Sequence, residues 1–168
     1  TLLHQNGEGV CLVALKDITE MKKLQDAYAK TEQILTTTVN GLSAHIALLD
    51  EAGTIVFVNT AWRRFAQENG LTPQTASEGV NYLHVCDTSC GDSSEGAKEF
   101  GEALRRILKG EKDSFRLEYP CHSPEVERWF IGKALAVRNK EHNFVLVVHE
   151  DITEFKRLEH KLRKNEYH

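Results

Sequence analysis

The chain has 168 residues, of which 40% are hydrophobic and 27% charged, and its formal net charge is −4. This composition is that of a globular domain and not of a disordered chain. Charges of both signs are mixed along the sequence, so we expect no binding to nucleic acid. The apolar runs fall far short of the roughly 20 residues of a membrane-spanning helix, so we expect no membrane contact. Four scattered cysteines are typical of free thiols in a reducing cytoplasm, and not of a secreted disulfide scaffold.

One short segment occurs twice, near the start and near the end of the chain. An apolar run that suits a buried strand leads into Asp17-Ile-Thr19-Glu in the first copy and into Asp151-Ile-Thr153-Glu154 in the second. Each aspartate stands where a helix N-cap is expected, with a glutamate three residues later, as in a capping box. Each strand is therefore predicted to pass into a helix with almost no loop, which makes these residues candidates for signal relay.

The helices predicted after the two copies carry apolar residues at the spacing of a coiled coil. Intervals of three and four residues alternate, as the a and d positions of a heptad require. We therefore predict a homodimer through linker helices at 20–42 and 154–168, with a surface helix packed on its own domain as the alternative. The predicted seam comprises Met21, Leu24, Tyr28, Thr31, Leu35, Thr38 and Leu42, and then Phe155, Leu158 and Leu162.

Residues 43–153, between the two linker helices, are predicted to form one α+β domain. Two strands joined by a tight turn come first, followed by three helical segments and then three more strands. This order implies a five-stranded antiparallel sheet with helices packed on one face. The expected strands are 44–50, 55–58, 114–119, 128–137 and 144–151, and the expected helical segments are 60–69, 73–81 and 95–109.

The order of these elements and several groups of residues resemble the PAS domain of bacterial and archaeal sensor proteins. LLDEAGTIVFVNTAW at 48–62 and the closing Asp151-Ile-Thr153 carry the general resemblance, over about residues 35–155. GVNYLHVC at 79–86 and EYPCHSPEVERWF at 118–130 resemble a subgroup found in histidine kinases and cyclic-dinucleotide enzymes. Residues 1–19 resemble the last two strands of a preceding PAS domain, joined by a turn at 6–9. We expect the chain to be part of a longer signalling protein.

The resemblance implies a ligand cavity between the sheet and the helices. Flavin-binding PAS domains that sense light carry a reactive cysteine where this sequence has Tyr82, so we expect no photoadduct. Haem or a structural metal is an alternative, with His84 and His149 as further haem-ligand candidates, although the cysteine spacing differs from a standard zinc site. The candidates for the pocket, whose ligand or cofactor stays unidentified, are Tyr82, Cys86, Tyr119, Cys121, His122 and Trp129.

The sequence contains no glycine-rich phosphate loop, no Ser/His/Asp arrangement and no HExxH. We therefore expect a sensory and relay module and not an enzyme, with any catalytic output domain outside this sequence. Two other interpretations stay open. A constitutive dimerisation or spacer module would have a core filled by its own side chains, and a redox sensor would use Cys86, Cys90 and Cys121.

Overall fold

The computed structural model describes residues 2–5, 8–11, 16–89, 94–121 and 127–166. The chain divides into two compact units, at residues 1–38 and 39–168. In the first unit, β1 (Leu2–Gln5) and β2 (Glu8–Cys11) form an antiparallel pair. The turn predicted between them includes Asn6 and Gly7, which lie outside the described residues.

The long helix α1 spans Thr19–Gly41. It begins directly after Asp17, whose Oδ1 atom accepts a hydrogen bond from the Thr19 backbone N–H at 2.9 Å. The apolar seam residues along this helix are exposed. The seam threonines, Thr31 and Thr38, donate their hydroxyls to carbonyl oxygens one turn earlier, so the helix itself satisfies these polar groups.

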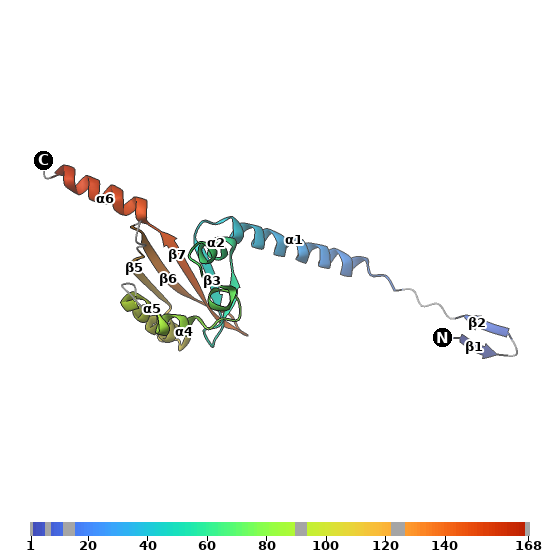
Figure 1. The fold of residues 1–168 in the computed structure, drawn as a ribbon. Coiled ribbons are helices and arrows are strands. Elements are labelled where there is room, and N and C mark those ends of the chain that lie inside the picture. The colour runs from blue at the N-terminus through green and yellow to red at the C-terminus, as the bar shows by residue number, and fades with distance from the viewer. Residues whose placement is uncertain (1, 6–7, 12–15, 90–93, 122–126, 167–168) are drawn as a thin grey trace. The chain divides into compact units, whose positions relative to one another are not determined.

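The second unit is built on a five-stranded antiparallel sheet with the strand order β4-β3-β7-β6-β5, and helices cover one of its faces (Figure 1). This arrangement confirms the predicted α+β architecture. Within the described residues, no helix has the length and apolar character that crossing a bilayer requires. The strands are β3 (His45–Leu49), β4 (Ile55–Val58), β5 (Ser114–Pro120), β6 (Trp129–Arg138) and β7 (Asn143–Asp151), and the remaining helices are α2 (Thr60–Glu68), α3 (Pro73–Ala76), α4 (Tyr82–Thr88), α5 (Ser94–Leu108) and α6 (Thr153–Glu166).

Helix α4 is absent from the sequence-based expectation, which places no helix at residues 82–88. It has only seven residues, and Cys86 is its one buried side chain, so it carries little helical periodicity. Asn81 nevertheless caps it, because its Oδ1 atom accepts a hydrogen bond from the His84 backbone N–H at 3.0 Å. The Asn81 Nδ2 atom donates to the Ala52 carbonyl at 3.0 Å, which holds α4 beside the β3–β4 turn.

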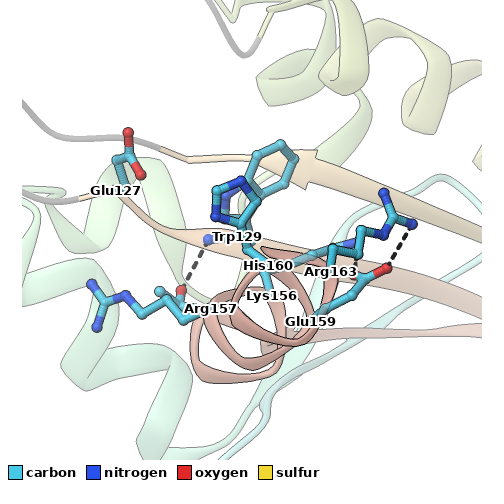
Figure 2. A pocket seen from close by; sticks show the side chains of 8 residues that line it. Glu127, Trp129, Lys156, Arg157, Glu159, His160 and Arg163 are labelled. Atoms are coloured by element: carbon cyan, nitrogen blue, oxygen red, sulfur yellow. Dashed lines mark hydrogen bonds and ion pairs between the residues drawn. The ribbon is translucent and has the colours of Figure 1, made fainter. Parts of the chain in front are cut away.

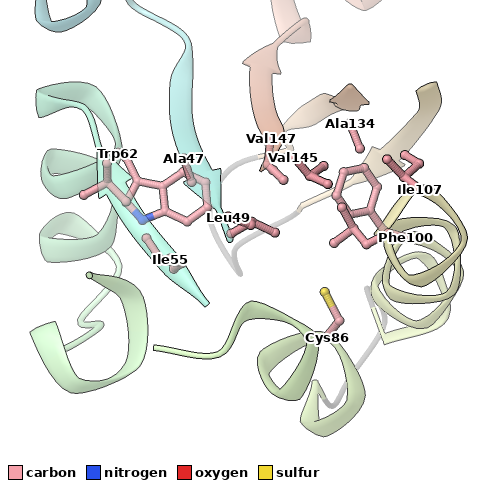
Figure 3. Close-up of a cluster of buried hydrophobic side chains, with 12 residues drawn as sticks. Ala47, Leu49, Ile55, Trp62, Cys86, Phe100, Ile107, Ala134, Val145 and Val147 are labelled. Atoms are coloured by element: carbon pink, nitrogen blue, oxygen red, sulfur yellow. The ribbon is translucent and has the colours of Figure 1, made fainter. Parts of the chain in front are cut away.

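The hydrophobic core lies between the sheet and helices α2, α4 and α5. Alternate residues of β7 face the helices, and Val145 and Val147 are almost completely buried among them. Figure 3 shows this cluster, with Trp62 of α2 on one side, Phe100 of α5 on the other, and Cys86 of α4 opposite the sheet. The next inward position of β7 is His149, where a polar group takes the place of an aliphatic side chain.

Asn59 joins the last turn of α1 to β3 and α2. Its Oδ1 atom accepts hydrogen bonds from the backbone N–H groups of Ile46 and Trp62, both at 3.0 Å. Its Nδ2 atom donates to the carbonyl oxygens of Val39 at 3.2 Å and Ala44 at 2.9 Å. The side chain is fully buried. The four bonds use both lone pairs of its oxygen and both protons of its nitrogen. A shift at the end of α1 therefore acts directly on the sheet.

Candidate ligand-binding site

Two cavities lie between the sheet and the helices of the second unit. One, of about 180 Å³, extends toward α2 and α3, and the other, of about 250 Å³, extends toward α4 and α5. The walls of both cavities include Tyr82, Val85, Tyr119 and His149. These residues therefore form a partition between two small hollows, each below the roughly 300–1,000 Å³ typical of drug-sized ligands.

His149 is the central group of this partition. Its Nε2 atom lies 2.9 Å from the Tyr82 hydroxyl, and its Nδ1 atom lies 2.7 Å from the Tyr119 hydroxyl. The side chain is only 9% exposed. We refer to Tyr82, His149 and Tyr119 as the Tyr–His–Tyr triad. It links α4, β7 and β5 by hydrogen bonds across the interior of the domain.

A glycine on the neighbouring strand makes room for the imidazole ring. Gly132 of β6 is the register partner of His149. A Cβ atom at Gly132 would lie 3.3 Å from the His149 ring and only 2.9 Å from a ring carbon of Phe100. Any larger residue at this position would displace one of these two rings, so the absence of a side chain is part of the site.

The triad is uncharged at neutral pH. Burial lowers the pKa of His149 to about 4, and the neighbouring His45 lowers it further. The pKa of His45 is itself lowered, chiefly by burial. Burial also raises the pKa of the Tyr82 and Tyr119 hydroxyls. A neutral imidazole has one N–H donor and one acceptor nitrogen, so the two tyrosines stand in opposite hydrogen-bonding roles toward it.

Apart from the two histidines, no titratable cation or carboxylate is found among the described residues of the cavity walls. The surroundings are aromatic: the ring centroid of Trp62 lies 5.8 Å from those of Tyr82 and His149, and that of Phe100 lies 5.4 Å from His149. Such walls suit a planar, uncharged compound, because they offer ring contacts and no partner for a buried charge.

The structure brings together three of the predicted pocket residues, Tyr82, Cys86 and Tyr119. Cys121 is half-buried beyond the end of β5 and belongs to neither cavity wall. Trp129 is also outside both walls, because it points to the other side of the sheet from its neighbour Phe130. It lines instead the groove beside α6, so its role as a ligand-pocket residue stays a prediction. His122 lies outside the described residues, as does Cys90.

In the sequence, His149 was predicted only as a candidate haem ligand. One signal could have marked it: it continues the inward-facing series of Val145 and Val147, so its imidazole must be buried. Because both ring nitrogens are already hydrogen-bonded to tyrosines, axial ligation of haem by His149 would require the triad to break. No cluster of three metal-ligating side chains occurs within the described parts of the chain.

Cys86 is poorly suited to redox chemistry. It is 4% exposed, and burial raises the pKa of its thiol to about 12. Because the thiolate is the reactive form, the native domain holds this cysteine in its unreactive state. Burial also raises the pKa of the Cys121 thiol. These two environments weaken the redox interpretation, and the third cysteine proposed for it, Cys90, lies outside the described residues.

The exit from the domain is a short junction between β7 and α6. Asp151, the last strand residue, accepts a hydrogen bond at Oδ1 from the Thr153 backbone N–H at 2.8 Å. The buried Thr153 hydroxyl accepts one from the Trp129 backbone N–H at 2.9 Å. The Ile152 N–H in turn donates to the Trp129 carbonyl at 2.8 Å. The first turn of α6 is thereby fastened to β6.

The capping geometry differs from the predicted capping box. The Lys156 N–H bonds to the Ile152 carbonyl, so Ile152 holds the cap position and Asp151 precedes it. The Asp151 side chain accepts a hydrogen bond from the Thr153 backbone N–H, two residues on. The second bond of a capping box, in which the Glu154 side chain would accept from the backbone N–H of the cap residue, is not found within the described residues. At α1, Asp17 and Ile18 make the same two contacts, so the repeated Asp-Ile-Thr sequence has the same local structure in both copies.

An open groove of about 450 Å³ lies where α6 leaves the sheet (Figure 2). Lys156 in this groove lies 2.7 Å from Glu118 of β5 and 3.6 Å from Glu159, and its ammonium is 5.9 Å from the ring centroid of Trp129. Arg163 lies 3.1 Å from Glu159. These ion pairs join the first turns of α6 to one another and to β5, so the groove is part of the junction between the sheet and α6.

Comparison with known proteins identifies the class of domain that this fold and cavity define. A sequence profile described as the PAS fold matches residues 39–157. The chain therefore belongs to the PAS-fold family, whose members are sensory and not catalytic modules.

Three similar proteins illustrate this membership. An "uncharacterized 104.1 kDa protein in hypE 3'region" of Rhodobacter capsulatus is 39% identical over 126 residues; the match covers 73% of this chain and 12% of the relative. The PAS domain of Bordetella pertussis BvgS is 17% identical with a TM-score of 0.54, covering 82% of this chain and 98% of that one. The sensor region of a sensor histidine kinase is 22% identical with a TM-score of 0.50, and the match covers 67% of this chain and 40% of that one. The two solved structures share the fold.

Proposed function

We propose that the chain is a sensory and signal-relay module of a larger signalling protein, and that a small molecule in the cavities beside His149 is its stimulus. One observation carries this proposal. Strand β7 contributes His149 to both cavity walls and ends two residues later at Asp151, which holds the first amide of α6. The stimulus site and the output helix thus share one strand. The 12% share of the Rhodobacter capsulatus relative that the chain matches is consistent with a part of a longer protein.

The spacer interpretation requires a core that its own side chains fill. The hollows of about 180 and 250 Å³ on either side of the triad do not fit that requirement, because well-packed interiors contain few voids larger than a water molecule. The aromatic lining and the buried hydroxyls are instead typical of a small-molecule site. The sensory function is therefore the better supported of the two.

Asp151→Ala should uncouple the domain from its output helix without unfolding it. The substitution removes the 2.8 Å bond to the Thr153 amide, and loss of a bond of this kind at a helix start costs about 0.5–2 kcal/mol. In the longer protein, output should become insensitive to the stimulus, while the free energy of unfolding decreases only by that amount. The measurements are an output assay with and without stimulus and a urea titration.

The matched control is Asp50→Ala, at the turn between β3 and β4. The Asp50 Oδ1 atom accepts hydrogen bonds from the Ala52 and Thr54 amides, at 3.0 and 2.8 Å, in a turn away from α6. Its loss should have a similar cost in stability and leave the stimulus response intact. A response preserved in Asp151→Ala, or lost equally in both variants, would contradict relay through this junction.

We also propose that α1 and α6 form parallel coiled coils with a second copy of the chain. The seam is solvent-exposed in the single chain: Leu24 is 73%, Leu35 62% and Leu162 66% accessible. Apolar residues at a strict heptad spacing are stabilised when a partner helix covers them. Leu42 lies beyond the end of α1, so the helical seam ends at Thr38.

Leu24→Asp combined with Leu35→Asp should convert this dimer to a monomer. A carboxylate at these positions would be buried in the dimer without a partner. The association would then be weakened by roughly several kcal/mol, because burial of an unpaired charge is strongly unfavourable. Light scattering measures the mass directly. Ala29→Asp with Thr36→Asp is the control, because these residues lie off the seam and should leave the dimer intact. A dimer mass that survives the Leu24/Leu35 substitutions would refute the coil.

A further inference from the structure

The triad has more hydrogen-bond donors than it uses. Two tyrosine hydroxyls and one neutral imidazole supply three donor protons, but only two hydrogen bonds join them. If the proton is on Nε2, this nitrogen donates to Tyr82, and Tyr119 donates to Nδ1. The Tyr82 proton is then spare. If the proton is on Nδ1, the roles exchange, and the Tyr119 proton is spare.

Neither hydroxyl has a second acceptor within the described residues, so one donor always faces the cavity region. Water can accept this proton in the resting state. A ligand that displaces the water must itself supply an acceptor, because a buried donor left unpaired loses affinity. An unused lone pair on a tyrosine oxygen carries a smaller penalty, so the demand is for an acceptor on the ligand and not for a donor.

We infer that the spare tyrosine hydroxyl of the triad recognises an acceptor, such as a carbonyl oxygen or ring nitrogen, on a small uncharged ring compound. This inference rests on the proposed function and names the ligand class of the same site. The cavity volumes limit the size of the ligand, and the aromatic walls favour a planar ring. The described lining offers no Asp, Glu, Lys or Arg to pair with a charged ligand.

Binding of such a ligand would also fix the tautomer of His149. An acceptor held by the Tyr82 hydroxyl requires the proton on Nε2, and one held by Tyr119 requires it on Nδ1. The tautomer of the His149 ring would then report which hydroxyl is occupied. Because His149 lies on the strand that ends at Asp151, this change occurs on the proposed relay path.

The test compares acetophenone with α-methylstyrene, which has nearly the same shape but carries C=CH2 in place of the carbonyl. Both are titrated by NMR into the 168-residue chain and into its Tyr82→Phe, Tyr119→Phe and Tyr28→Phe variants. The wild-type chain should bind acetophenone about tenfold more tightly, the factor expected for one satisfied buried donor. Tyr28 lies on α1 and outside the described walls of both cavities, so removal of its hydroxyl should preserve the preference.

One of the two cavity variants should lose the preference and the other should keep it. The nearest remaining donor would be an imidazole N–H, which lies 2.9 Å behind the lost Tyr82 oxygen or 2.7 Å behind the lost Tyr119 oxygen and is too far away to replace it. The 15N spectrum of His149 in wild-type protein provides a second readout that does not depend on a variant. Acetophenone should produce a single tautomer, the one that matches the sensitive tyrosine.

The outcomes separate this inference from the function on which it rests. Equal binding of the two compounds, or a preference kept in both cavity variants, would overturn the acceptor requirement and leave small-molecule sensing standing. Absence of binding by either compound would overturn the inference together with the cavity as the sensing site.

Discussion

Replacing Asn59 with alanine should lower the free energy of unfolding by about 4 kcal/mol, because the fully buried amide makes four hydrogen bonds and each contributes about 0.5–1.5 kcal/mol. Alanine would leave two backbone N–H groups and two carbonyl oxygens without these partners. It would also remove the side-chain cap of α2. The loss is a large part of the roughly 5–15 kcal/mol by which domains of this size are stable.

Urea unfolding at neutral pH measures this effect, with Asn69→Ala as the matched control. Asn69 is exposed, and its Nδ2 atom donates to the Phe65 carbonyl at 2.8 Å. Its substitution should cost less than about 1 kcal/mol, as for most surface changes. Equal losses in the two variants would show that the Asn59 network does not hold the end of α1 against the sheet.

Acidification should destabilise the domain by about 2 kcal/mol between about pH 7 and pH 4.5, because each unit of pKa difference corresponds to roughly 1.4 kcal/mol. The pKa of His149 falls from 6.5 in the unfolded chain to about 4 in the folded domain. In the interval between these values the unfolded state binds the extra proton, so stability decreases as the pH falls. His45, whose pKa is also lowered, changes stability in the same direction.

The measurement is the free energy of unfolding as a function of pH for three proteins. The slope should be steep in the wild-type chain and in His84→Gln, since His84 is exposed on α4. It should be shallower in His149→Gln, even if this variant is less stable at every pH. Parallel curves for wild type and His149→Gln would show that His149 is not held neutral by the fold.

Local sequence patterns predicted most of the strands and helices of the domain and their order. The apolar run rich in Val and Leu at 145–148 indicated a buried strand, and the order of strands and helices led to the correct five-stranded sheet. The repeated Asp-Ile-Thr sequence predicted two strand-to-helix junctions with little loop. The junction of β7 and α6 has this form, whereas β2 ends at Cys11 and residues 12–15 before α1 lie outside the described residues. The position of the cap was one residue wrong, because the first helical hydrogen bonds run to the carbonyl oxygens of Ile18 and Ile152 and not to those of Asp17 and Asp151.

The candidate site depended on contacts that local patterns do not encode. Tyr82 and His149 are 67 residues apart, and Tyr119 and His149 are 30 apart, so only the folded sheet brings them together. The same holds for Gly132, whose missing side chain matters because of its strand partner. Trp129 lies beside α6 and outside the described walls of the two cavities, a placement that also depends on the folded sheet.

Hydrogen–deuterium exchange at the junction tests most directly whether the cavity communicates with the output helix. The amides of Ile152, Thr153 and Trp129 are followed with the cavity empty and with it filled by the compound that binds in the NMR titration. We predict that filling the cavity slows exchange of these amides severalfold, whereas the Thr54 amide in the β3–β4 turn is unaffected. Asp151→Ala should abolish the difference. Junction exchange that is identical in the empty and the filled domain would contradict the account.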